Sequence, residues 1–349
     1  MEHTPVVPVP AVGTAVWDVP PDDLDWAAPR RRRLRIAGTV VAWAAVAVSA
    51  AWLTVRASGA GQGTVVETFI VFTPYVALGT LLAVPAALLL RAPRAALAAA
   101  GCAVGYALVL APLFLWGPRP VPPPRGPELR VATANVQFGR ADAAALVRLV
   151  RDRDVDVLGV QELTPGFADR LDDAGIGDLL PHRILEPGAG AAGSGLYSRF
   201  PVEPVADEVT GRFASPTGRL DVPGAPPVEV TVVHAVPPVS GEGRADWAGT
   251  MDTLPRPDPR GAVHLLIGDF NATVDQPTLR DLLDDGYVDA AGAVGRGWAV
   301  TWRTRLTPPL AIDHVLVDRA TAVREASEHG VPGSDHRAVL AHLRLPTAA

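Results

Sequence analysis

The sequence predicts a layered α/β domain that follows three membrane-spanning helices. Residues 36–117 of the 349-residue chain carry almost no charge, whereas residues 129–346 alternate short apolar strand patterns with a few helical ones. Strands interspersed with helices over about 220 residues are typical of one compact, layered α/β unit. The chain is therefore expected to combine an apolar amino-terminal segment with a single larger domain.

Three uncharged stretches are long enough to cross a bilayer. They are Ile36–Val55, Thr68–Leu90 and Ala95–Gly117, with 20, 23 and 23 residues. About 20 helical residues span a hydrocarbon core of about 30 Å, and a helix satisfies the backbone polar groups there. The alternative is that they are buried helices of a soluble domain, but such runs exceed ordinary globular helices. We interpret residues 36–117 as a three-helix transmembrane segment whose partner is the lipid bilayer.

Arginines predict the sidedness of this segment. Five of them lie within residues 30–35 before the first stretch, and two lie within residues 91–94, whereas the 56–64 loop carries one. Basic loops stay in the cytoplasm, so three spans place the following domain outside a plasma membrane that the chain crosses several times. Arg119 and Arg125 beyond the third stretch count against this orientation. A cleaved signal peptide in place of the first span is an alternative that leaves the domain on the same side.

Two Pro-rich segments frame the apolar region. Residues 1–29 lack hydrophobic periodicity, so residues 1–35 are predicted to be a disordered cytoplasmic tail with a basic end. Residues 118–128 include the run PRPVPPPRGP, which favours a stiff, extended linker. The domain itself is then expected over residues 129–346.

Composition narrows the chemistry of this domain. Residues 129–349 hold 21 Arg and 30 Asp and Glu residues, and the single cysteine of the chain is Cys102. One cysteine excludes an intramolecular disulfide and a Cys-based zinc site. An acidic domain argues against a dedicated binder of nucleic-acid phosphates and suits a site that recruits metal cations.

Polar side chains follow the apolar strands of the predicted domain. Strand patterns are predicted at residues 129–135, 155–160, 195–198, 228–234, 262–267, 311–317 and 338–345, and helices at 141–153 and 278–283. The polar residues at or just beyond these strands are Asn135, Glu162, His234, Asp269, Asn271, Asp313, His314, Asp335 and His336. Such side chains can converge on one rim of the domain.

Oxygen-rich side chains of this kind suit Mg²⁺, with Mn²⁺ as an alternative. A carboxylate beside the metal can activate a water, while His and Asn donors stabilise charge on a phosphoryl group. The sequence contains no nucleophile-elbow serine or cysteine and no phosphate-binding G-x-x-x-x-G-K-[ST] loop. Water is therefore the expected nucleophile.

Six motifs occur in order along the domain: ATANVQFG, VLGVQEL, VVHAV, LLIGDFNAT, AIDHVLV and GSDHRAV. They resemble the motifs of the endonuclease/exonuclease/phosphatase superfamily over about residues 129–346. The resemblance implies an α/β four-layer sandwich, in which two β-sheets are flanked by helices. It also implies metal-dependent hydrolysis of phosphoester bonds.

The resemblance implies a metal-binding role for three of the residues. Glu162 is similar to the main metal ligand of the superfamily. Asn135 would touch the metal or the phosphate beside it, and Asp335 would contact the metal region.

Five further residues are implied to be catalytic. Asp269 resembles the carboxylate that orients or deprotonates the attacking water, and Asn271 resembles a phosphate donor. His234 is similar to the histidine that hydrogen-bonds the phosphate or helps the leaving group. His336 resembles the histidine at the scissile phosphate, and Asp313 would hold its tautomer.

Some residues are interpreted as structural. In a strand the side chain of His314 points away from that of Asp313, so His314 is expected to be structural. Trp302 is expected to pack in the core, and most exposed arginines to be solvated. Ala311 stands where many members of the superfamily have Arg, which removes one possible anchoring cation.

The sequence as a whole predicts a membrane-tethered, Mg²⁺-dependent phosphoesterase that hydrolyses a phosphodiester or a phosphomonoester. Tethering and acidity favour a lipid headgroup or a small phosphoester over nucleic acid, although a nuclease remains an alternative. A binding or regulatory membrane protein that keeps the fold without turnover is a second alternative.

Overall fold

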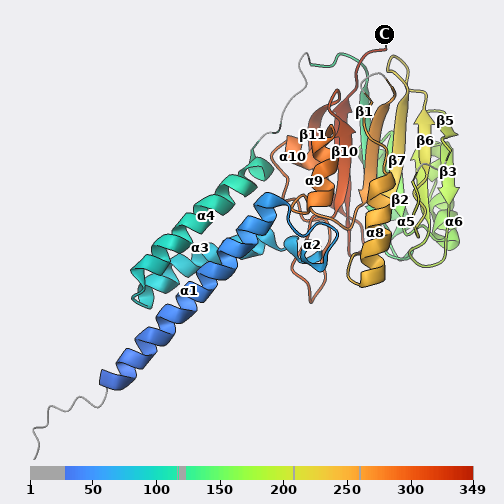
Figure 1. Ribbon diagram of the computed structural model, residues 1–349. Helices are drawn as coiled ribbons and strands as arrows, with labels where there is room; N and C mark the ends of the chain where they lie inside the picture. The colour runs from blue at the N-terminus through green and yellow to red at the C-terminus, as the bar shows by residue number, and fades with distance from the viewer. Residues whose placement is uncertain (1–27, 116, 118–122, 207–208, 259–260, 349) are drawn as a thin grey trace, which may run out of the picture.

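A helical bundle and a larger α/β domain make up the protein in the computed structural model (Figure 1). The structure describes residues 28–115, 117, 123–206, 209–258 and 261–348. Most of the predicted tail and part of the predicted linker thus lie outside the described residues.

Twelve strands of the described chain form two six-stranded sheets. The first sheet has the order β11 (Ala322–Gly330), β12 (Arg337–Arg344), β1 (Glu128–Asn135), β2 (Val157–Gln161), β4 (Ser194–Ser198) and β3 (His182–Glu186). The second has the order β5 (Val202–Pro204), β6 (Thr217–Leu220), β7 (Val228–His234), β8 (Val263–Asp269), β10 (Asp313–Asp318) and β9 (Tyr287–Asp289). In each sheet the two central strands run parallel, β1 with β2 and β7 with β8, and every other pair is antiparallel.

Helices cover the outer faces of both sheets. The helices of the domain are α5 (Ala143–Asp152), α6 (Pro165–Asp173), α7 (Ile176–Leu179), α8 (Gly241–Thr253), α9 (Pro277–Asp284) and α10 (Ala290–Ala293). Apolar side chains of α5 and α6, such as Leu146 and Phe167, pack on the first sheet. Side chains of α8 and α9, such as Trp247 and Leu279, pack on the second.

A third apolar cluster fills the space between the two sheets. It joins Val131 and Val157 of the first sheet to Val230 and Ile267 of the second. Three cores separate four layers, so the predicted sandwich of two sheets flanked by helices is confirmed.

Close approach of two strands explains one glycine in the LLIGDF segment. Gly268 has a φ of 154°, and a Cβ built on it would lie 1.9 Å from the carbonyl oxygen of Val233. Glycine therefore lets the parallel strands β7 and β8 meet just before their polar ends.

The apolar segment contains four helices, and the predicted second span is broken. The helices are α1 (Ala28–Ser58), α2 (Val65–Ile70), α3 (Thr73–Leu89) and α4 (Pro93–Phe114). The side chain of Thr64 caps α2, and Pro74 lies in the first turn of α3, where proline begins a new helix. The single helix predicted at residues 68–90 was therefore wrong.

Only two helices of the described chain are long and apolar enough to cross a membrane, Arg30–Ser58 and Pro93–Phe114. At a rise of about 1.5 Å per residue, the 17 residues of α3 extend about 25 Å, less than a hydrocarbon core of about 30 Å. The expectation of three spanning helices is thus corrected to two candidates. Helix α1 also begins at Ala28, so the basic cluster predicted to end a disordered tail is helical.

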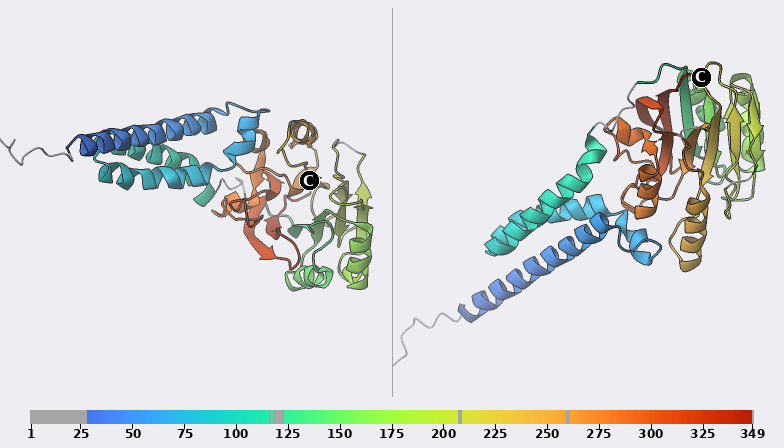
Figure 2. Two further views of the ribbon diagram at one scale, coloured as in Figure 1. Left: turned by 90° about the horizontal axis from the view of Figure 1, so that it is seen from below. Right: turned by 45° about the horizontal axis from the view of Figure 1, so that its top comes forward.

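The bundle of α1, α3 and α4 projects from one end of the domain (Figures 1 and 2). Buried contacts connect the two parts. Arg56 at the end of α1 donates to Asp275 at 2.6 Å, and the Tyr75 hydroxyl of α3 donates to the carbonyl of Pro309 at 2.5 Å. The bundle therefore joins the domain at the adjoining ends of α1 and α3. It also joins at the end of α4, where Gly297 N donates to the carbonyl of Leu113 at 2.7 Å.

Candidate active site

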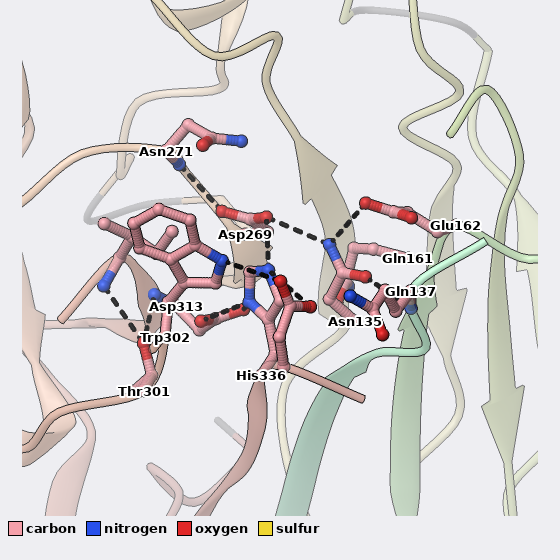
Figure 3. Close-up of polar contacts among 12 residues, drawn as sticks. Asn135, Gln137, Gln161, Glu162, Asp269, Asn271, Thr301, Trp302, Asp313 and His336 are labelled. Atoms are coloured by element: carbon pink, nitrogen blue, oxygen red, sulfur yellow. Dashed lines mark hydrogen bonds and ion pairs between the residues drawn. The ribbon is translucent and has the colours of Figure 1, made fainter. Parts of the chain in front are cut away.

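The ends of the two central parallel pairs meet at one edge of the sandwich. Asn135 ends β1, and Glu162 directly follows β2. His234 ends β7, Asp269 ends β8, and the two are paired in register. Because parallel strands end at the same edge of a sheet, the chain brings an amide, two carboxylates and an imidazole together there. Figure 3 shows Asn135, Glu162 and Asp269 side by side.

His336 and Asp313 form a buried pair. The Nδ1 atom of His336 lies 2.9 Å from Asp313 Oδ2 and 3.1 Å from Asp313 Oδ1. This bond places the proton on Nδ1 and leaves Nε2 facing Asp269, 3.8 Å from its Oδ2 atom. Burial by itself would lower the pKa of His336, but the carboxylates of Asp313, Asp269 and Asp335 outweigh it and raise the pKa to about 10.

The carboxylate of Asp269 is almost fully buried. Burial raises the pKa of Asp269 to about 7, and the neighbouring charge of Asp313 adds to this shift. The positive charge of His336 opposes it, as do hydrogen bonds from Asn271 N at 2.9 Å and Asn135 Nδ2 at 3.0 Å. A carboxylate with a pKa near neutrality is suited to accept a proton.

Glu162 lies on a strained turn at the rim of the site. Its φ is 59°, and Gln137 and Phe138 opposite it also have positive φ values. Non-glycine residues adopt this conformation at a cost, and such strain is typical of functional sites. Phe138 N donates to Glu162 Oε2 at 2.5 Å, and Asn135 Nδ2 donates to Oε1 at 3.1 Å. Burial raises the pKa of Glu162, and these hydrogen bonds work against that shift.

Two sets of side chains can be considered for a divalent cation. The first is the oxygen-rich set Glu162, Asp335 and Asn135, in which both carboxylates line the cleft. The second comprises Asp269, Asp313 and His336, whose ligand atoms lie within 4.8 Å of one another. In the second set Asp313 is already bonded to His336. The oxygen donors of the first set fit Mg²⁺ or Mn²⁺ better, because these cations prefer oxygen ligands.

His234 and Asn271 complete the polar side of the site. Burial lowers the pKa of His234 to about 3, and the charge of His336 adds to the shift, so the ring is neutral. Its Nδ1 atom is buried and has no hydrogen-bond partner among the described residues, and the ring stacks on Phe213 at a centroid distance of 4.6 Å. Asn271 has a φ of 46° and donates from Nδ2 to the carbonyl of Ala235 at 2.9 Å.

A cleft of about 630 Å³ contains most of these groups. Six of the eight predicted residues line it: Glu162, His234, Asp269, Asn271, Asp335 and His336. Asn135 and Asp313 are hydrogen-bonded to residues that line the cleft. Asn135 bonds to Glu162 and Asp269, and Asp313 bonds to His336. The structure therefore brings all eight predicted residues into one site.

His314 does not line the cleft, which agrees with the expectation that it is structural. Its side chain is buried, with Nε2 2.9 Å from the carbonyl of Ala272 and Nδ1 3.2 Å from Asp289. It ties β10 to neighbouring segments and does not face the site. Three of the exposed arginines, Arg199, Arg212 and Arg219, pair with acidic residues elsewhere on the surface.

Trp302 packs against the buried cluster of Val71, Leu310 and Ile312, but it is also part of the site, which the sequence analysis did not predict. Trp302 is only partly buried, lines the cleft and donates from Nε1 to Asp335 Oδ2 at 3.1 Å. The sequence could not reveal this contact, because it depends on the 300–310 loop folding back beside His336. The sequence feature that could have pointed to a role of Trp302 in the site is an aromatic residue within the arginine-containing segment TWRTR.

The sequence model of the Endonuclease/Exonuclease/phosphatase family matches residues 132–336 of this protein, which is more than half of the chain. The chain belongs to this family. Members of the family are hydrolases that act on phosphoester bonds, and divalent metals are common among them. No curated protein matches the chain.

Several solved structures are similar to this chain. The structure of humanized D. rerio TDP2 with 14 mutations is 16% identical with a TM-score of 0.50, and the match covers 62% of this chain and 98% of that chain. An endonuclease/exonuclease/phosphatase from Beutenbergia cavernae DSM 12333 is 22% identical with a TM-score of 0.49, with 64% and 72% covered. Sphingomyelinase C from Streptomyces griseocarneus is 18% identical with a TM-score of 0.42, with 62% and 99% covered.

Proposed function

We propose that this protein is a divalent-metal-dependent phosphoesterase attached to a membrane by its amino-terminal helices. The observation that carries the proposal is the cleft itself. It places the carboxylate of Asp269 beside the imidazole of His336, with the oxygen ligands of Glu162 and Asp335 on the same surface. Family membership supplies the class of reaction, and this geometry supplies groups suited to it.

The proposed reaction is attack of water on phosphorus. Asp269 orients the water and accepts its proton as the new oxygen–phosphorus bond forms and the bond to the leaving oxygen breaks. His336, held by Asp313, donates from Nε2 to a phosphoryl oxygen and stabilises the charge that develops there. Asn271 and the unpaired nitrogen of His234 offer further contacts for the phosphate or the leaving group.

We assign Mg²⁺, or Mn²⁺, to Glu162, Asp335 and the side-chain oxygen of Asn135. A cation held there would neutralise negative charge on the phosphoryl oxygens. Asn135 also orients its neighbours: its Oδ1 atom accepts from Gln137 N at 2.9 Å, and its Nδ2 atom donates to Glu162 and to Asp269. The Asn135 amide therefore positions the carboxylates of Glu162 and Asp269.

Exposed apolar side chains support attachment to a membrane. Among the described residues, 20 of the 24 exposed large hydrophobic side chains lie between Leu34 and Leu115. Such a concentration of exposed apolar surface is costly in water. Arg31, Arg32, Arg35 and Arg91 gather at the end of the bundle away from the domain. With the basic end in the cytoplasm, the domain would lie outside the cell.

For the substrate, we propose a lipid headgroup or a small phosphoester over nucleic acid. The acidic domain supports this choice, since binding to nucleic-acid phosphates relies on basic residues. A nucleic-acid substrate remains one outcome of a substrate screen.

The experiment is hydrolysis by the full chain in nanodiscs. With Mg²⁺ the protein should cleave 4-methylumbelliferyl phosphodiesters, and EDTA should abolish turnover. Asp269→Asn should lower kcat by about 10²–10⁴, the usual range for loss of a general base. The matched control is Asp252→Asn, because Asp252 is exposed on α8 and does not line the cleft. Equal activity of Asp269→Asn and wild type would refute the mechanism, and metal binding without hydrolysis of any phosphoester would favour a binding protein.

A further inference from the structure

The α2 segment, residues 64–72 between the first two apolar helices, forms one wall of the candidate active site. Thr68, Phe69, Val71 and Phe72 line the same cleft as Asp269 and His336. These residues precede the family match by more than 50 positions. The segment is thus part of the site although it belongs to the apolar amino-terminal region.

Polar contacts hold the α2 segment against the domain. The buried carboxylate of Glu67 accepts from Thr278 N of α9 at 3.0 Å and from Gly63 N at 2.6 Å. Thr68 donates from its hydroxyl to the carbonyl of Pro238 at 2.8 Å. A buried carboxylate that accepts two backbone bonds is well satisfied there. These contacts fix the segment at its beginning.

The end of the segment and its flanking helices are fixed as well. Val71 packs with Leu310 and Ile312, which border the catalytic residues. The ion pair between Arg56 and Asp275 is almost fully buried, with side-chain exposures of 8% and 2%. Breaking such a pair is costly because an uncompensated charge is left behind. The wall therefore has a defined position and does not depend on a chance surface contact.

The cleft has a polar floor and an apolar wall. Phe69, Phe72, Phe138, Phe213 and Val239 surround the catalytic carboxylates and histidines. Phe69, Phe138 and Val239 remain 53%, 46% and 78% exposed, so they do not serve to fill a core. Apolar side chains kept exposed at the rim of a polar site are typical of a surface that is covered by a ligand.

The apolar wall adjoins the exposed apolar residues of the bundle along the chain. Exposed Leu78 lies on α3, which begins three residues after the end of α2. A hydrocarbon chain lying along Phe69 and Phe72 would thus run from the catalytic cleft towards the surface that we assign to the bilayer. This adjacency favours a bilayer lipid over a soluble amphiphile as the source of the substrate.

We propose that the α2 segment selects an amphiphilic phosphoester carried by a bilayer lipid, with its phosphate at Asp269 and His336 and its hydrocarbon part against Phe69 and Phe72. This inference rests on the proposed phosphoesterase function and names its substrate class. The apolar segment is then a substrate-binding element as well as an anchor.

The test is a chain-length series on the full protein in nanodiscs. The probes are 4-methylumbelliferyl alkyl phosphodiesters with ethyl, hexyl and dodecyl chains, supplied as monomers in solution and, for the dodecyl ester, incorporated into the nanodisc bilayer. For wild type, kcat/KM should rise with chain length by up to about fourfold for each methylene group that is fully buried. The dodecyl ester should be hydrolysed from the bilayer.

Variants of the wall provide the matched comparison. Phe69→Ala should reduce the ratio of kcat/KM for dodecyl to ethyl ester by at least about tenfold, since roughly one aromatic side chain of apolar contact is lost. Phe69→Leu should give an intermediate ratio, which separates lost contact from misfolding. Val65→Ala should keep the wild-type ratio, because Val65 is exposed on the same helix and does not line the cleft.

Each outcome separates the two proposals. Equal kcat/KM for all chain lengths, or a Phe69→Ala ratio equal to that of wild type, would overturn the substrate class while leaving the phosphoesterase in place. Hydrolysis of the dodecyl ester only from solution would overturn the bilayer source. Failure to hydrolyse any ester at any Mg²⁺ concentration would instead overturn the proposed function.

Discussion

The two halves of the domain use the same strand arrangement to present different chemistry. In the first sheet the parallel pair β1 and β2 ends at Asn135 and Glu162, and in the second the pair β7 and β8 ends at His234 and Asp269. Glu162 lies on a strained turn at the rim, whereas His234 and Asp269 are almost fully buried. Burial sets the pKa of Asp269 near neutrality, and partial exposure leaves Glu162 open to a cation. The comparison suggests that the first half holds the metal and the second half moves the proton.

The largest expected effect comes from His336, which precedes β12 of the first sheet and is hydrogen-bonded to Asp313 of the second. His336→Gln removes the donor to the phosphoryl group and should lower kcat by about 10²–10⁴ at any Mg²⁺ concentration. Asp313→Asn should have an effect of similar order, because it leaves the ring without the carboxylate that fixes its tautomer. Steady-state kinetics with a Mg²⁺ titration would measure both. Full rescue of His336→Gln by Mg²⁺ would place this residue in the metal site and break the comparison.

A smaller and different effect is expected from Glu162 in the first half. Glu162→Gln keeps the size of the side chain and removes its negative charge. The Mg²⁺ concentration for half-maximal activity should therefore rise about 10–100-fold. Activity should return at high Mg²⁺, unlike that of Asp269→Asn. Isothermal titration with Mn²⁺ gives a readout independent of turnover. An unchanged metal affinity would remove Glu162 from the metal site.

The pH dependence should sharpen the assignment of Asp269. Because burial raises the pKa of Asp269 to about 7, the carboxylate is protonated below that pH and cannot accept a proton from water. The value of kcat/KM should therefore rise about tenfold per pH unit up to about pH 7 and then level off. A nearby cation stabilises the carboxylate, so more Mg²⁺ should move this limb to lower pH. A limb that persists unchanged in Asp269→Asn would belong to another group.

The smallest expected effect is that of Trp302. Trp302→Phe keeps the ring and removes the bond from Nε1 to Asp335, which corresponds to about 0.5–1.5 kcal/mol, or a two- to tenfold loss in metal affinity or kcat. The same titration as for Glu162→Gln would measure it. A loss above a hundredfold would show that Trp302 does more than position Asp335.

Much of the sandwich and of the site could be predicted, because the central strands are strongly apolar and end in polar residues. Strands β3 and β11 were missed, since their residues are partly exposed and show no clean alternation. Strands β5, β6 and β9 were missed as well, since they are only three or four residues long. Helix α8 was missed because GEGRADWAGTMDT has two glycines in its first turn, and its large buried apolar side chains, Trp247 and Met251, are too few to give a clear helical pattern.

The parts of the site that could not be predicted depend on contacts between distant residues. The sequence pattern predicts one apolar helix at residues 68–90. In the structure, the hydrogen bond from Thr278 N to Glu67 holds the α2 segment against the domain, and the proline at the start of α3 begins a new helix. The predicted helix is therefore split between the wall of the cleft and α3. Trp302 reaches Asp335 only because its loop pairs with Leu310 and His336. Neither contact leaves a local pattern in the sequence.

The most direct test of the central claim is the location of the cation in a crystal structure of the full chain with Mn²⁺ and phosphate. We expect anomalous density for Mn²⁺ at Glu162 and Asp335, and phosphate within hydrogen-bonding distance of His336 and Asn271. Manganese bound between Asp269 and Asp313, with His336 displaced from its carboxylate partner, would contradict the division of roles between the two halves.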